Sequence, residues 1–243
     1  MKILIVNPNS TASMTHKIGE AAARVAAPAT TLRAVNPPHA PASIECYTEE
    51  ALCVPGLLHC IQQGEAQGYD GYVIACFGDP GLDAAREQAR GPVIGIAQAA
   101  MHAASMVANS FSVVTTLERT VGMAWHLAER YGMRRFCRNV RAADLPVLDL
   151  EDPAKNARAL IRDACLRALR EDRCESIVLG CAGMTDLCRS LSDEIGAPVI
   201  DGVAVAVKLV ESLATLGLRT SKLGDWATPP IKPQPTLSPG ASC

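Results

Sequence analysis

The sequence has few aromatic residues and no long apolar run, and both absences exclude classes of function. Phe, Trp and Tyr make up only 4% of the 243 residues, so there is no set of stacking side chains for nucleic acid. Lys and Arg form no run, and the net charge of −2 offers no attraction to an anionic membrane. No stretch approaches the roughly 18 apolar residues of a membrane span, and the first apolar run is too short for a signal peptide. We therefore expect a cytoplasmic protein with no nucleic-acid or membrane partner.

Signatures of cofactor and metal binding are also missing. The sequence contains no GxGxxG turn, no phosphate-binding loop and no GxSxG elbow, so nucleotide cofactors and serine hydrolysis are unsupported. None of the ten cysteines forms a CxxC pair. Cys46, Cys53 and Cys60 recur every seven residues, a spacing more typical of one helix face than of a metal site. We predict reduced thiols, no metal and no cofactor.

What is present is a matched pair of cysteine segments. Residues 71–82 read GYVIACFGDPGL and residues 176–187 read SIVLGCAGMTDL. In each, an apolar run suited to a buried parallel strand leads to a cysteine, and a glycine follows two residues later. A matched pair of thiols is what a reaction needs when a proton must reach either face of a planar carbon.

The spacing of other landmarks indicates that the whole fold is duplicated. Val6 and Val114 are 108 residues apart, Cys76 and Cys181 are 105 apart, and Pro92 and Pro198 are 106 apart. Strands are predicted at 2–6, 72–76, 93–96, 112–114, 176–179 and 198–200, with helices between them. The pattern predicts an α/β protein of two pseudo-symmetric lobes, each a small parallel β-sheet flanked by helices, with the active site in the cleft between them.

The same landmarks suggest boundaries for the lobes. We assign residues 1–96 and about 201–220 to a first lobe that carries Cys76, and residues 97–200 to a second lobe that carries Cys181. Residues 221–243, here named the tail, contain five prolines and little apolar pattern, which is typical of a flexible or surface-wrapping segment.

The position of the two cysteines favours acid–base chemistry. Ligands in parallel sheets bind beyond the carboxyl ends of the strands, where both cysteines are expected. Asp79 and Thr185 are candidate helix caps, so each sulfur is expected near a helix N-terminus that lowers its pKa. Gly78 and Gly183 would let a ligand oxygen approach backbone N–H groups. The alternative is that the thiols only pack in the core, as most cysteines do.

Polar turns follow the first strand of each lobe and supply further candidates for substrate binding. Asn9, Thr115 and Thr116 can either bind substrate carbonyl and N–H groups or cap helices, whereas Ser10 and Thr11 fit the capping role better. The five histidines lie away from the strand ends, and none is assigned a role.

Four stretches together resemble the aspartate/glutamate/hydantoin racemase superfamily over residues 1–222. They are ILIVNPNST near the start, ACFGDPGL around Cys76, SVVTTLERT at 112–120 and LGCAGM around Cys181. The similarity is to the hydantoin racemase branch, which includes allantoin racemases. The resemblance implies two pseudo-symmetric α/β lobes, racemisation without a cofactor, Cys76 and Cys181 as the acid/base pair, and a homo-oligomer.

One departure from the superfamily pattern bears on the substrate. Racemases of free acidic amino acids place Asn-Thr after the first cysteine, whereas this chain has Phe77-Gly78, and Ala182-Gly183 after the second. This favours a neutral cyclic ring as the small-molecule substrate, with Phe77 as a wall. We expect a racemase of 5-substituted hydantoins, with allantoin as the physiological substrate. A related decarboxylase, a cis–trans isomerase and a non-catalytic binding protein remain alternatives.

Overall fold

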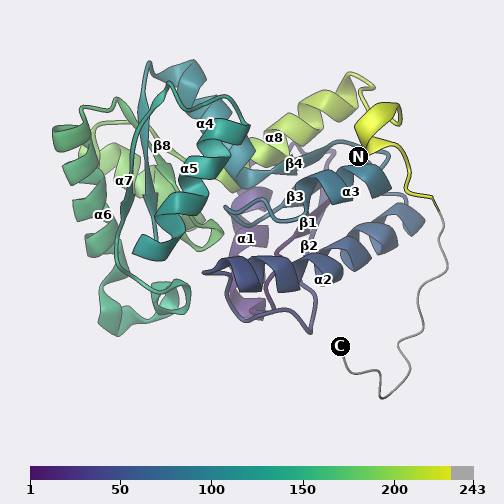
Figure 1. Cartoon of the computed structure of the whole chain (residues 1–243), viewed down its shortest axis with the longest axis horizontal. Helices are drawn as coiled ribbons and strands as arrows, with labels where there is room; N and C mark the ends of the chain where they lie inside the picture. The colour runs from purple at the N-terminus through teal and green to yellow at the C-terminus, as the bar shows by residue number, and fades with distance from the viewer. Residues whose placement is uncertain (231–243) are drawn as a thin grey trace, which may run out of the picture.

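Two α/β lobes lie side by side, as Figure 1 shows. In this computed structural model residues 1–230 are described, and the rest of the tail, 231–243, lies outside the described residues. Each lobe is built on a four-stranded sheet whose strands are all parallel. The predicted fold class, two similar lobes with small parallel sheets flanked by helices, is confirmed.

The sheet of the first lobe has the strand order β2-β1-β3-β4. Its members are β1 (Lys2–Val6), β2 (Thr31–Val35), β3 (Gly71–Ile74) and β4 (Val93–Gly95). The connecting helices are α1 (Ala12–Val25), α2 (Tyr47–Ala66) and α3 (Leu82–Gln88). β1 and β3 are almost continuously apolar because helices cover both faces of a parallel sheet.

The second lobe repeats this arrangement with the order β6-β5-β7-β8. Its strands are β5 (Phe111–Thr115), β6 (Cys137–Ala142), β7 (Ser176–Leu179) and β8 (Val199–Ile200). Its helices include α5 (Val121–Arg130), α6 (Ala157–Arg167) and α7 (Cys188–Ile195), and a 3₁₀ segment, Ala182–Leu187, precedes α7. The strands that precede the two cysteines, β3 and β7, thus occupy equivalent positions, each beside the first strand of its lobe.

Sequence analysis missed one strand in each lobe. β2 and β6 are edge strands, and they begin at Thr31 and Cys137, 106 residues apart, which is the spacing of the other landmarks. β2 contains Arg33, and β6 contains Arg138 and Arg141. Charged side chains are usual on an edge strand, and here they interrupt the apolar run that marks a buried one.

Two helices connect the lobes, and each packs in the lobe opposite to that of the strand before it. α4 (Ile96–Val107) follows the last strand of the first sheet but packs in the core of the second lobe, with Phe111 and Val178. α8 (Gly202–Thr215) follows the last strand of the second sheet and returns to pack against Ile3 and Val73 of the first. The chain therefore crosses between the lobes twice.

The first part of the tail packs against the protein surface. The Lys222 ammonium group donates hydrogen bonds to the carbonyl groups of Arg86 and Glu87 at the end of α3, at 2.5 and 2.9 Å. The Arg86 guanidinium group also lies 4.8 Å from the centre of the Trp226 ring. Among residues 1–230, no helix is long and apolar enough to cross a membrane.

Candidate active site

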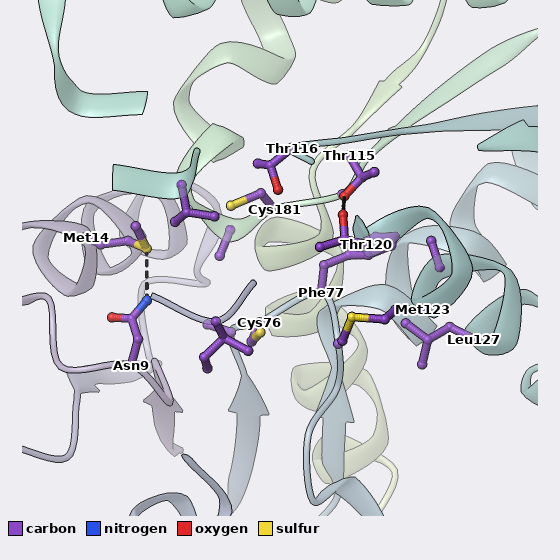
Figure 2. Close-up of a pocket in the computed structure, with 17 residues that line it drawn as sticks. Asn9, Met14, Cys76, Phe77, Thr115, Thr116, Thr120, Met123, Leu127 and Cys181 are labelled. Atoms are coloured by element: carbon purple, nitrogen blue, oxygen red, sulfur yellow. Dashed lines mark hydrogen bonds between the residues drawn. The ribbon is translucent and has the colours of Figure 1, made fainter. Parts of the chain in front are cut away.

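A narrow pocket lies between the carboxyl ends of the two sheets, and Figure 2 shows its lining. Its cavity volume is about 50 Å³, room for roughly three to five water molecules. Both lobes supply its walls: Asn9, Met14, Ile44, Ala75, Cys76, Phe77, Gly78, Thr115, Thr116, Thr120, Met123, Ala124, Leu127, Val147, Gly180, Cys181 and Ala182.

The structure brings the predicted site residues together. Eight of the nine line this pocket: Asn9, Cys76, Phe77, Gly78, Thr115, Thr116, Cys181 and Ala182. The ninth, Gly183, lies just behind the wall, and its backbone N–H donates to the Cys181 sulfur at 3.4 Å. The two cysteines lie on opposite sides of the pocket in Figure 2. A flat ligand between them would present one face to each thiol.

The expected lowering of the thiol pKa values is wrong. Burial raises the pKa of the Cys181 thiol to about 11, although the Gly183 N–H opposes it. Burial raises the pKa of the Cys76 thiol well above its ordinary value, against the Gly78 N–H, which lowers it. Loss of hydration thus outweighs the backbone dipoles. Each glycine N–H faces the sulfur of its own segment, where it stabilises the thiolate.

The local capping pattern also differs from the prediction. Asp79 does not cap α3, which has Gly81 as its N-cap. Its carboxylate instead accepts hydrogen bonds from the first turn of α4. Thr185 does not cap α7 either, because it lies inside the 3₁₀ segment. The residue before α1 is Thr11, and its side chain makes no capping hydrogen bond.

The side chain after each cysteine packs in the core of the other lobe. Phe77, which follows Cys76, packs in the core cluster of the second lobe, with Phe111. Ala182, which follows Cys181, packs in the core cluster of the first lobe, with Ile3. These reciprocal contacts hold the two segments close, so both thiols have a fixed place in the cleft.

The polar turns differ in how much of their hydrogen-bonding capacity is used. The Asn9 amide oxygen accepts from Asn7 and from the Thr11 N–H, and its nitrogen lies 3.3 Å from the Met14 sulfur. The Thr115 hydroxyl group lies 2.8 Å from that of Thr120, which donates in turn to a backbone carbonyl. Within residues 1–230, the Thr116 hydroxyl group makes no protein hydrogen bond and can meet a ligand.

Sequence reasoning missed most of the apolar lining. Met123 and Leu127 come from α5, and their four-residue spacing marks the apolar face of that helix without showing that the face meets a pocket. Ile44 comes from a loop and Val147 begins a short 3₁₀ helix, Val147–Glu151, and neither segment carries a periodic signal. This lining makes the site an apolar slot with a few polar groups, which suits a small uncharged ring.

The sequence profile of the Asp/Glu/Hydantoin racemase family matches residues 3–210. The chain belongs to this family. It is 53% identical over 232 residues to a hydantoin racemase of Rhizobium meliloti, covering 96% of each chain. Among solved structures, an allantoin racemase from Klebsiella pneumoniae shares 53% identity with a TM-score of 0.94, covering 96% of this chain and 95% of its own.

An allantoin racemase from Pseudomonas fluorescens is also similar, at 38% identity and a TM-score of 0.92, covering 96% of this chain and 99% of its own. The two relatives at 53% identity are racemases, which are isomerases, and the resemblance in the sequence is confirmed. Identity does not separate two kinds of substrate, because the hydantoin and allantoin racemases named first share the same 53% with this chain.

Proposed function

We propose that this protein racemises 5-substituted hydantoins, allantoin among them, by proton transfer at C5 between Cys76 and Cys181. The observation that carries the proposal is the placement of these two cysteines on opposite sides of one pocket. The activities named for its 53%-identical relatives support it.

The proton transfers follow from the chemistry of the ring and the thiols. The C5 hydrogen of a hydantoin is flanked by a carbonyl group and a ring nitrogen, so its removal leaves a planar enolate. A thiolate on one face takes this proton and becomes a thiol, while the thiol on the other face gives a proton and becomes a thiolate. The opposite enantiomer uses the same pair in reverse. Protons then exchange with water to restore the starting state.

Other residues have supporting roles in this proposal. The Gly78 and Gly183 N–H groups stabilise each cysteine while it is a thiolate. Thr116 has an available hydroxyl group to donate to the enolate oxygen. Phe77 and the apolar side chains exclude water from the carbanion. Asn9, Thr115 and Ala182 shape the edge of the ring site.

The direct test is deuterium exchange at C5 in heavy water, followed together with loss of optical rotation. Cys76→Ser and Cys181→Ser should each lower racemisation about 10²- to 10⁴-fold, the usual effect of losing an acid or base. Each variant should still exchange the C5 proton of only one enantiomer, opposite for the two variants. Cys60→Ser, which removes a buried thiol outside the pocket, should racemise normally. Normal racemisation by both pocket variants would rule out the two-thiol mechanism.

A comparison of substrates tests the ring substituent. Allantoin has a polar ureido group at C5, whereas 5-isopropyl- and 5-benzylhydantoin have apolar groups. Allantoin as the physiological substrate requires the highest kcat/KM among the three. A higher value for the two apolar hydantoins would move the assignment to amino-acid-derived rings while leaving the mechanism intact.

A further inference from the structure

Asp79 is a buried carboxylate that the proton transfer does not use. It lies three residues after Cys76, is 1% exposed, and has a backbone φ of 45°, a left-handed conformation that costs energy outside glycine. Its N–H donates to the Cys76 carbonyl oxygen at 3.0 Å, so the two residues belong to one tight turn. A strained and buried charge directly behind a reactive thiol needs a structural reason.

Its hydrogen bonds join the turn to the other lobe. One carboxylate oxygen accepts from the Ala97 N–H at 3.0 Å, and the other accepts from the Gln98 N–H at 2.9 Å. The second oxygen also accepts from the Tyr131 hydroxyl group at 2.7 Å. Ala97 and Gln98 lie in the first turn of α4, and Tyr131 is the C-cap of α5; both helices pack in the second lobe. The Cys76 turn is therefore fixed to two helices of the second lobe, of which α5 lines the pocket.

Comparison of the two lobes shows that the carboxylate that caps α4 comes from an unusual position in the chain. In the second lobe Asp201 is the N-cap of α8, and its own carboxylate accepts from the Val203 and Ala204 N–H groups. The matching N-cap of α4 is Gly95, which lies 106 residues before Asp201, the same spacing as that of Pro92 and Pro198. A Cβ atom on Gly95 would lie 2.2 Å from the Asp79 carboxylate carbon. Asp79 thus fills the space that a local cap would occupy.

The electrostatic surroundings fit a carboxylate that acts on Cys76. Burial raises the pKa of Asp79 to about 6, while hydrogen bonds from Tyr131, Gln98 and Ala97 and the charge of Arg86 lower it. The group is therefore mostly ionised at neutral pH. Its charge adds to burial in raising the pKa of the Cys76 thiol.

We propose that Asp79 is the positioning residue of Cys76: by capping α4 and accepting from Tyr131, it sets where the Cys76 sulfur stands in the cleft. This inference rests on the proposed function only in treating Cys76 as one member of the proton-transferring pair. The second cysteine has no carboxylate at the matching place, where Met184 supplies a buried apolar side chain. The two thiols are therefore held by different means.

The first test measures the thiols directly and needs no substrate. Iodoacetamide labelling resolved by peptide mass spectrometry compares the alkylation rates of Cys76 and Cys181 in one sample. Asp79→Asn and Tyr131→Phe should each raise the Cys76 rate at least fivefold and leave the Cys181 rate within twofold. Tyr72→Phe is the matched control, because it removes a hydroxyl group that donates to Glu65 over the same 2.7 Å. Equal changes at both cysteines, or no change at either, would overturn the proposal.

A second pair of variants separates positioning from helix capping. Asp79→Gly removes the cap and suits the left-handed backbone. Adding Gly95→Asp restores a local cap on α4, in an extended backbone conformation (φ −84°, ψ 145°) of the same class as that of Asp201 (φ −87°, ψ 107°). We expect the double variant to regain the Tm lost by the single one while Cys76 alkylation stays fast. If the double variant regained both the wild-type Tm and the slow wild-type alkylation of Cys76, Asp79 would be only a helix cap.

The third test reads the catalytic consequence. Asp79→Asn should lower kcat about tenfold or more with little change in KM, because misplacing a reacting group slows the chemical step. Racemisation has an equilibrium constant of one, so kcat/KM must fall equally for both enantiomers. The C5-deuterium isotope effect should instead rise for the enantiomer that Cys76 deprotonates and fall for the other. Isotope effects that change in the same direction for both enantiomers would overturn the proposal.

An inactive wild-type protein would refute the proposed function, but the alkylation test of Asp79 would still apply because it needs no substrate.

Discussion

The carboxylate of Glu45 accepts a hydrogen bond of 2.5 Å from the backbone N–H of Val147, a contact that joins a loop of the first lobe to the start of a 3₁₀ helix in the second. Ile44 and Val147 both line the pocket, so the contact lies at the edge of the ring site. The charge of Glu45 also raises the pKa of the Cys181 thiol, after the larger effect of burial. One side chain thus links the two lobes at the edge of the pocket and adds to the raised pKa of a pocket thiol.

Glu45→Ala should raise KM about tenfold, the effect of losing one hydrogen bond to a charged group. Glu45→Gln keeps an acceptor oxygen, so its KM should stay close to that of the wild type. Steady-state kinetics give both values, and hydrogen exchange of residues 143–151 should speed up in Glu45→Ala alone. A KM that rises equally in both variants would assign the effect to charge instead of loop closure.

The raised thiol pKa values predict a rate that depends strongly on pH. Since the Cys181 pKa is about 11 and that of Cys76 is also raised, only a small fraction of the enzyme carries a thiolate at pH 7. That fraction grows about tenfold per pH unit below the lower pKa of the coupled pair. We expect log kcat/KM to rise with a slope near one from pH 7 to 9. Glu45→Gln should shift this limb to lower pH, whereas a flat profile would show that one thiolate already exists at pH 7.

The duplicated fold and most of the site could be predicted because both leave a pattern in the sequence. A buried strand that ends before Cys76 or Cys181 is a continuous apolar run, and its repetition at one spacing reveals two lobes. The edge strands β2 and β6 and the loop residue Ile44 leave no such pattern. The hydrogen bonds from α4 to Asp79 join residues of different elements, so no local pattern predicts them. The role of Gly95 becomes visible only when the structure shows that Asp79 fills the space of its missing side chain.

Gly95→Ala should displace the Asp79 carboxylate from the N-terminus of α4 while Asp79 itself is not substituted. The new Cβ would overlap the Asp79 carboxylate, so the carboxylate must leave the α4 N-terminus or the backbone must move. We expect a destabilisation of about 1–3 kcal/mol by chemical unfolding, the usual range for an overpacked site. Gly122→Ala is the matched control: it lies in α5 with its nearest neighbour 4.0 Å away, and alanine favours a helix. Equal stability of the two variants would contradict the conclusion that the Asp79 carboxylate fills the space beside Gly95.

The adjacent residues Thr115 and Thr116 should respond differently to the same substitution. Thr115 is bonded to Thr120, so Thr115→Val should lower the free energy of unfolding by about 1 kcal/mol and change kcat little. The Thr116 hydroxyl group faces the pocket and, in the part of the chain that the structure describes, has no protein partner. Thr116→Val should therefore leave stability nearly unchanged and lower kcat about 10²-fold, the scale of losing one donor to an enolate oxygen. Thermal unfolding and racemisation assays on both variants check the pair, and a larger loss of kcat in Thr115→Val would reverse the two assignments.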